Sequence, residues 1–142
     1  RTEEDRIALI GGVIDGTIDC IATDHAPHRL EEKETTFDIA SCGMIGLESC
    51  FGAVNKVLSV DNNVKIERVI DSLTVKPRKI MGFNVDLFSL DAEAEITVLD
   101  VNQKWEFSVK DIESKSVNSP FIGKSLSGKV LYTISKNFLA SI

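Results

Sequence analysis

The sequence has few of the features that disulfide-rich, secreted and membrane proteins require. Its three cysteines are odd in number and lack paired spacing, which favours reduced thiols over a disulfide framework. No stretch approaches the roughly 20 apolar residues of a membrane span, and the first residues, rich in Glu, Asp and Arg, show no signal-peptide pattern. We therefore expect a cytoplasmic protein that is neither secreted nor membrane-spanning.

Basic residues are also in the minority. The 142 residues include 16 Lys and Arg against 22 Asp and Glu, which gives a net charge of −6. Because nucleic-acid backbones are bound by clustered Lys and Arg, this balance argues against nucleic acid as a partner. The chain has no internal repeats or Pro-rich linkers, and its length falls within the usual size of one domain.

The most informative segment is 18–28, which reads IDCIATDHAPH. Its first part is a short apolar run with β-branched members, bounded by turn residues, which predicts a strand over 18–23 that is buried on both faces. Such strands belong to parallel α/β sheets, in which polar side chains at the carboxyl end face a shared site. Asp24, His25 and His28 lie at that end, so we expect a functional site there.

The octapeptide 21–28 resembles the signature of dihydroorotases, the zinc amidohydrolases that interconvert dihydroorotate and carbamoyl aspartate in pyrimidine synthesis. Segments 1–6, 43–48 and 114–121 follow the order and spacing of the same family, so the resemblance covers nearly the whole chain. Hydantoinases and allantoinases share the Asp-His pair after a strand, but the Ala-Pro-His ending favours dihydroorotase.

The resemblance implies an α/β fold in two parts. Residues 1–82 would be the C-terminal part of a (β/α)8 amidohydrolase barrel, with its last strand and flanking helices. Residues 83–142 would be part of a small accessory β-domain. On this interpretation the chain is a C-terminal fragment of the enzyme, and the rest of the barrel is its first partner.

The apolar pattern agrees with this division. It predicts helices from about Glu3 to Asp15, over 44–58 and over 66–73, and a short one that Thr74 and Pro77 open and that closes near Gly82. The first helix is capped by Thr2 and ended by Gly16. After residue 82 alternation predicts antiparallel strands around 96–98, 105–109 and 130–134, with Trp105 and Phe107 in their core. Residues 25–42 are expected to form a long loop beside the site.

The resemblance also implies roles for single residues. Asp24 would bind the metal and act as general base and then acid, although an Asp after a strand also commonly caps a turn. His28 would bind the substrate carboxylate, and the backbone of Ala40 and Gly43 would contact the substrate. His25 would either orient Asp24 or be a packed structural histidine.

Two departures from the family pattern affect these expectations. The family has a proline where this chain has Ser41, so the turn 41–43 loses a fixed φ angle and is expected to be looser. The final hairpin glycine is replaced around Lys136 and Asn137, and Asn tolerates the left-handed conformation that such a turn needs. Asn118 is interpreted as a structural bridge that returns the chain toward the barrel.

The cofactor implied by the resemblance is zinc, as one or two ions. A catalytic zinc site needs about three protein ligands, and the chain supplies only the last-strand aspartate of the family, Asp24. Its two histidines both lie in the motif, and no His-x-His pair is present. A site built from His25 and His28 alone would lack further ligands. We therefore expect the chain to be inactive without the rest of the barrel.

Two other interpretations remain open. The chain is a non-catalytic dihydroorotase-like assembly subunit, of the kind found beside aspartate transcarbamoylase, or it is part of a hydantoinase or allantoinase. A homo-oligomer is also open, because a barrel strand without its neighbours has unpaired edges. We expect segment 18–23 to pair with a second copy or with the β-domain.

Overall fold

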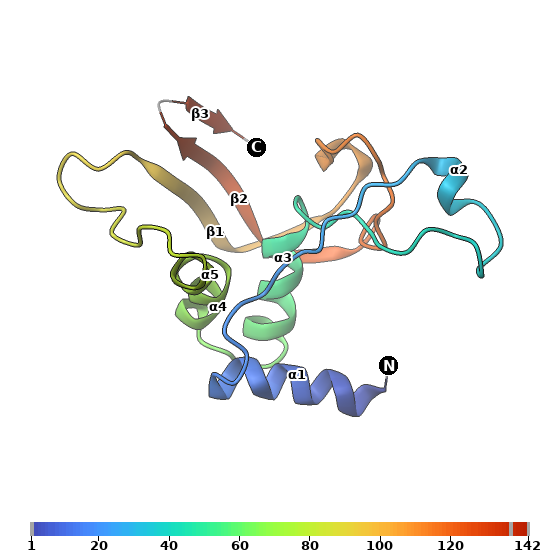
Figure 1. Ribbon diagram of the computed structural model, residues 1–142, viewed down its shortest axis with the longest axis horizontal. Coiled ribbons are helices and arrows are strands. Elements are labelled where there is room, and N and C mark those ends of the chain that lie inside the picture. Colours follow the sequence, from blue (N-terminus) through green and yellow to red (C-terminus); the bar gives the residue numbers. More distant parts are fainter. Residues whose placement is uncertain (1, 137, 142) are drawn as a thin grey trace.

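A computed structural model describes residues 2–136 and 138–141 of the chain. A three-stranded sheet lies on one side of the molecule and the helices α1, α4 and α5 on the other, with α3 between them (Figure 1). Within the described residues, no helix is both long and apolar enough to cross a membrane. The cysteines Cys20, Cys42 and Cys50 are all free, as their spacing predicted.

The first helix, α1 (Glu3–Asp15), is confirmed together with both caps. The Thr2 hydroxyl accepts the Asp5 N–H at 3.2 Å, and the Asp5 carboxylate accepts the Thr2 N–H at 2.9 Å, which forms a capping box. Gly16 ends the helix with a φ of 91°, in the left-handed conformation that glycine adopts without a steric penalty.

The second predicted helix begins later than expected. Helix α3 (Cys50–Asn55) continues as a π-helical turn, η1 (Lys56–Val60), so the prediction is right from residue 50 but wrong over 44–49. The backbone there bonds to distant residues instead: the Met44 carbonyl accepts the Ala26 N–H at 2.9 Å, and the Ile45 N–H donates to the Asn118 carbonyl at 3.1 Å. These bonds use groups that a helix would need.

Helices α4 (Ile66–Leu73) and α5 (Val75–Ile80) are confirmed. They complete a helical core with α1 and η1, formed by Ile10, Val13, Leu58, Val64 and Val69. Segment 18–23 contributes Ile18 and Ile21 to the edge of this core.

The strand predicted over 18–23 is wrong in this structure. No parallel neighbour lies beside the segment within the described residues, and a strand cannot form a ladder alone. Its backbone bonds instead to helices: the Ile18 N–H donates to the Gly12 carbonyl at 2.8 Å and the Ile21 N–H to the Ser72 carbonyl at 3.0 Å. The Ile18 carbonyl accepts from the Arg68 side chain at 3.1 Å. An isolated parallel bridge follows between His25 and Met44. Pairing with the β-domain, one of the two partners that we expected, does not occur in the described chain.

The predicted antiparallel sheet is confirmed, with the order β1 (Glu95–Glu106), β2 (Ser125–Ser135) and β3 (Phe138–Ser141). The strand predicted around 96–98 and the first two residues of the one predicted over 105–109 belong to β1, which ends at Glu106. Its register is irregular between Val98 and Leu99 and between Asp100 and Lys104. Val109 is not in a strand but begins the 3₁₀ turn η2 (Val109–Asp111). Lys136 has a left-handed φ of 46° after β2, whereas Asn137 lies outside the described residues.

Helix α3 packs directly on the sheet. Phe107 is fully buried and Leu126 is 2% exposed beneath the helix, and the Trp105 indole N–H donates to the Gly128 carbonyl at 2.9 Å. A Cβ on Gly128 would lie 2.6 Å from the Phe51 ring, so this contact needs glycine. The core position predicted for Phe107 is confirmed, and the boundary near residue 83 stays a prediction.

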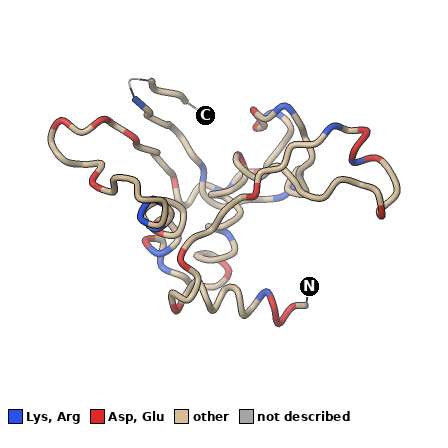
Figure 2. Tube along the Cα trace, in the orientation of Figure 1, with Lys and Arg blue, Asp and Glu red and all other residues tan. Residues whose placement is uncertain are grey.

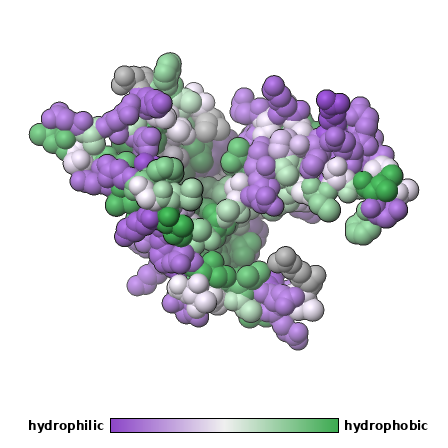
Figure 3. Space-filling model, viewed as in Figure 1, coloured by the Kyte–Doolittle hydropathy of each residue, from purple (hydrophilic) through white to green (hydrophobic). Residues whose placement is uncertain are grey.

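The loop 25–42 extends away from this body and carries a short helix, α2 (Leu30–Lys33) (Figure 1). Residues of both charges occur along it (Figure 2). Apolar surface is also exposed, in the centre of the view between α1 and the sheet (Figure 3). Ile7 and Ile14 on α1 are 58% and 55% exposed, which is unusual for large apolar side chains on one helix.

Candidate active site

Asp24 lies where the chain turns sharply between the helical core and the loop. Its φ of 46° is left-handed, a conformation that Asp adopts more readily than most residues and that recurs at functional sites. The side chain is exposed, and no hydrogen bond or ion pair to it is found within the described residues. Its carboxylate is therefore free to accept a proton or to coordinate a cation.

His25, the next residue, is held by its surroundings. Its Nδ1 accepts the Gly46 N–H at 3.1 Å and the Leu47 N–H at 3.4 Å, so the neutral ring carries its proton on Nε2. Nε2 lies 3.4 Å from the Ser114 hydroxyl. Both ring nitrogens are thus engaged by groups other than Asp24, which favours the packed structural histidine over the orienting role.

Ser114 links His25 to a carboxylate. Glu48 Oε1 accepts the Ser114 N–H at 2.8 Å and also the Ser114 hydroxyl. Partial burial acts to raise the pKa of Glu48, but the hydrogen bonds from Ser114 outweigh it and the pKa lies below its ordinary value. Glu48 Oε2 is buried without a partner in the described chain. Glu48 and Ser114 are not among the site residues predicted from the sequence.

His28 lies in a cleft of about 670 Å³ that Gly43 and segment 115–120 also line. Its Nε2–H donates to the Cys42 carbonyl at 2.8 Å, and Nδ1 lies 3.4 Å from a carboxylate oxygen of Glu32. The Arg29 N–H donates to that carboxylate at 3.0 Å and, with His28, holds the pKa of Glu32 below its ordinary value. An imidazole that donates to a carbonyl at the cleft wall can donate to a ligand carboxylate instead.

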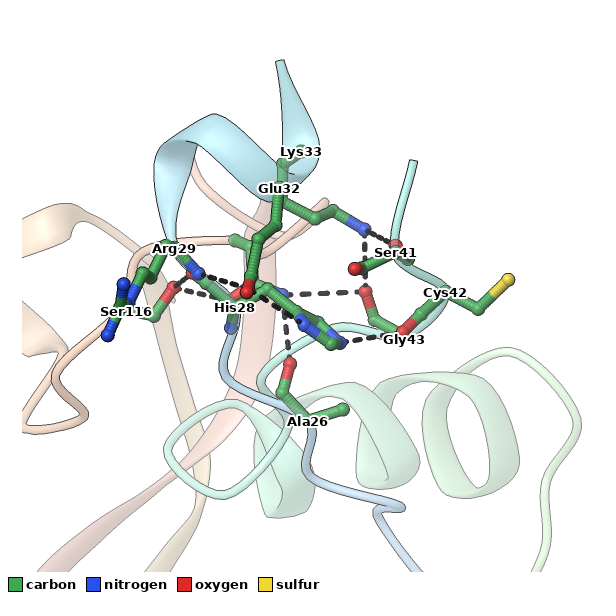
Figure 4. Close-up of polar contacts among 10 residues, drawn as sticks. Ala26, His28, Arg29, Glu32, Lys33, Ser41, Cys42, Gly43 and Ser116 are labelled. Carbon is green, nitrogen blue, oxygen red and sulfur yellow. Dashed lines mark hydrogen bonds and ion pairs between the residues drawn. The ribbon is translucent and has the colours of Figure 1, made fainter. Parts of the chain in front are cut away.

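The turn 41–43, which lacks the proline of the family, is stabilised by hydrogen bonds from Lys33. The Lys33 ammonium donates to the Ser41 carbonyl at 2.7 Å and to the Gly43 carbonyl at 2.9 Å (Figure 4). The Ser41 N–H donates to the Glu32 carbonyl at 3.0 Å. The looseness that we expected from Ser41 is therefore offset by Lys33, which the sequence analysis missed.

The two predicted backbone contacts differ in what they offer. Gly43 has a φ of 106°, and a Cβ there would lie 2.7 Å from the Ala26 Cβ, so only glycine fits. Its carbonyl is engaged by Lys33, which leaves its N–H. The Ala40 N–H donates to Thr36 at 2.9 Å, which leaves its carbonyl, and Ala40 does not line the cleft.

The described residues do not fit a complete zinc site. No three His, Cys, Asp or Glu side chains in residues 2–136 and 138–141 lie close enough together to hold an ion. Asp24 fits as one ligand of such a site, because its carboxylate is exposed and unengaged, but the ring nitrogens of His25 and His28 are occupied. The other ligands would have to come from outside this chain.

Comparison with known proteins identifies relatives over almost the entire sequence, although no family model matches. The dihydroorotase of Elusimicrobium minutum is 43% identical over 133 residues, which are 94% of this chain and 31% of that protein. The dihydroorotase of Chlorobaculum tepidum is 44% identical over 90% of this chain and 29% of that protein. The chain thus spans about a third of the length of the curated relatives that it matches.

Solved structures with a similar fold are amidohydrolases. The L-hydantoinase of Arthrobacter aurescens matches 99% of this chain and 32% of its own with a TM-score of 0.88 at 23% identity. The inactive dihydroorotase-like domain of the Chaetomium thermophilum CAD-like multifunctional protein matches 98% of this chain and 36% of its own with a TM-score of 0.60 at 21% identity. At these identities the likeness establishes the fold alone, part of an amidohydrolase of the hydantoinase type. The sequence relatives add the family: this chain is homologous to dihydroorotases and corresponds to a C-terminal fragment of about a third of their length.

Proposed function

We propose that the chain is the C-terminal part of a zinc dihydroorotase, which reversibly hydrolyses the cyclic amide of dihydroorotate to N-carbamoyl-aspartate. One observation carries the proposal: relatives named dihydroorotase are 37% to 44% identical to nearly the whole chain. Zinc, pyrimidine biosynthesis, a cytoplasmic location and a surrounding (β/α)8 barrel belong to the same proposal.

Asp24 is the proposed acid-base residue. In the whole protein a metal bound with Asp24 as one ligand would make the attacking water nucleophilic. The Asp24 carboxylate takes the proton of that water and returns it to the leaving ring nitrogen. Its exposed, unengaged position in the left-handed turn supports this role.

His28 and the loop supply substrate contacts in this proposal. His28 exchanges its bond to the Cys42 carbonyl for one to the substrate carboxylate. Gly43 offers its N–H to an acceptor carbonyl of the cyclic amide, because its own carbonyl is engaged by Lys33. A contact from the Ala40 carbonyl stays a prediction from the resemblance, because Ala40 does not line the cleft.

The rest of the barrel is the proposed partner of this chain, with a homo-oligomer or aspartate transcarbamoylase as further partners of the complete protein. The apolar side chains exposed on α1, such as Ile7 and Ile14, would be covered by the missing part. The metal ligands other than Asp24 would also lie there, so the 142-residue chain alone should not turn over substrate.

Two alternatives have an observation in their favour. The structural match to an inactive dihydroorotase-like domain favours a non-catalytic assembly subunit, and the match to hydantoinases favours a hydantoinase or allantoinase. The test is an assay of the longer gene product with zinc on dihydroorotate, hydantoin and allantoin, beside the isolated chain. Turnover of dihydroorotate by the longer protein alone supports the proposal. Turnover of hydantoin or allantoin instead, or of none of the three, supports the corresponding alternative.

A further inference from the structure

Segment 114–118 connects β1 to β2 in the sequence but contacts the candidate active site with every second side chain. The Ser114 hydroxyl lies 3.4 Å from His25 Nε2. The Ser116 hydroxyl donates to the His28 carbonyl and lies 2.6 Å from Asn118 Oδ1. Ser114, Ser116 and Asn118 thus all contact residues 25–28.

Both the oxygen and the nitrogen of the Asn118 side-chain amide form hydrogen bonds to residues of the candidate site. Its Oδ1 accepts the His28 N–H at 3.3 Å, and its Nδ2 donates to the Ala26 carbonyl at 2.9 Å and to the Gly43 carbonyl at 3.4 Å. Its own carbonyl accepts the Ile45 N–H at 3.1 Å. One side chain therefore ties the loop 26–28, which carries His28, to the turn that carries Gly43.

The catalytic segment has no strand ladder to fix its direction, and residues 25–28 are anchored by segment 42–47 and by segment 114–118. Residues 18–23 form no ladder, and Asp24 adopts a left-handed conformation without a hydrogen bond to its side chain in the described chain. Three residues after Asp24 are held by segment 114–118. Ser114 contacts the His25 ring, Asn118 donates to the Ala26 carbonyl, and Ser116 donates to the His28 carbonyl.

We propose that segment 114–118 is a positioning brace for the active site, with Asn118 as its central residue. Asn118 sets the separation between His28 and the Gly43 N–H, and so governs the binding of substrate more than the proton transfer at Asp24. The proposal rests on the proposed dihydroorotase function and names positioning residues for it. It also gives the small β-domain a role in catalysis, because the brace is the connection between β1 and β2.

The test compares Asn118→Ala and Asn118→Asp with the wild type in the longer, zinc-loaded gene product. Alanine removes all four side-chain hydrogen bonds, so KM for dihydroorotate should rise about tenfold while kcat changes less than about threefold. Aspartate has nearly the same shape but turns a carboxylate toward the Ala26 and Gly43 carbonyls. Its KM should be raised as in the alanine variant, because a carboxylate has no donor for these two carbonyls.

Amide hydrogen exchange provides a readout that does not depend on turnover. The His28 N–H, and peptides that cover residues 25–28 and 43–46, should exchange faster in Asn118→Ala, while peptides from α1 and α4 are unchanged. Asn102→Ala is the matched control, because Asn102 is exposed in β1 and no bond of its side chain is found in the described chain. It should leave KM and exchange as in the wild type.

The outcomes separate the brace from the function on which it rests. An active wild type with an unaltered KM and unaltered exchange in both Asn118 variants would overturn the brace alone. A wild type without dihydroorotase activity would overturn the proposed function, and local exchange in residues 25–28 would still test the brace. If Asn118→Ala does not fold, Ser116→Ala, with Ser125→Ala in β2 as its control, makes the same comparison.

Discussion

The side-chain amide of Asn55 donates to the backbone carbonyl of Ser127 at 2.9 Å, and both residues are buried. The same amide donates to the Val101 carbonyl at 3.0 Å. Asn55 lies at the end of α3, whereas Val101 and Ser127 lie on β1 and β2 beside the register irregularity. One helical side chain thus donates to a carbonyl on each of two neighbouring strands and joins the helical part to the sheet.

Asn55→Ala should destabilise the protein by about 2 to 4 kcal/mol, because it leaves the buried Ser127 carbonyl and the part-buried Val101 carbonyl without this donor. Denaturant unfolding of the variant measures this loss. Asn62→Ala is the matched control: its exposed amide donates to a single carbonyl, that of Val57, and its loss should cost less than about 1 kcal/mol. Equal losses for the two variants would contradict the interpretation of Asn55 as the link between helix and sheet.

Gly43→Ala should be more damaging than Gly123→Ala. Both glycines have positive φ, 106° and 75°, so both variants bear a similar backbone penalty of about 1 kcal/mol. Only at Gly43 does the added Cβ meet another atom, the Ala26 Cβ at 2.7 Å. The crowding should add about 1 to 3 kcal/mol of instability and weaken substrate binding. Thermal unfolding and KM together check this. Equal losses of stability and equal KM values for the two variants would show that the turn shifts to accommodate the added Cβ atom.

Asp24→Asn in the longer gene product should lower kcat by about 10²-fold or more, because an amide cannot accept and return the proton. Asp19→Asn is the control within the same segment. Asp19 is exposed, its contact is an ion pair with Lys76 at 3.3 Å, and surface pairs of this kind contribute little. Steady-state kinetics on dihydroorotate measure both. Retention of activity in Asp24→Asn would remove Asp24 from the mechanism.

Stability should decrease in acid partly through Glu48. The folded state lowers the pKa of this carboxyl below its ordinary 4.5, so its contribution is complete above that pH and is lost as the pH falls through the folded value. Glu48→Gln should lower stability near neutral pH and flatten its decline below about pH 4.5. Urea unfolding at a series of pH values gives the slope. A slope as steep as that of the wild type would assign the acid sensitivity to other carboxyls.

Much of the fold could be predicted from local patterns. Helices α1, α4 and α5 follow from apolar periodicity and turn residues, and the alternation after residue 82 predicts the antiparallel sheet. The errors arise where distant residues compete for the backbone. Residues 44–49 have a helical pattern, but Ala26, Asn118 and His25 take their backbone groups. Segment 18–23 has the composition of a strand, but a strand needs neighbours that the described chain does not provide.

The sequence by itself determined the family and the identity of the candidate motif residues, because the octapeptide ending in His28 and the dihydroorotase relatives are properties of residue order alone. Tertiary structure alone decided which groups support them. Lys33, Glu48, Ser114 and Asn118 lie up to 92 residues from their hydrogen-bond partners, and no periodicity encodes such a pairing. Side-chain hydrogen bonds depend on distances of about 3 Å and on direction, and these are fixed only when the helices and the sheet have packed together.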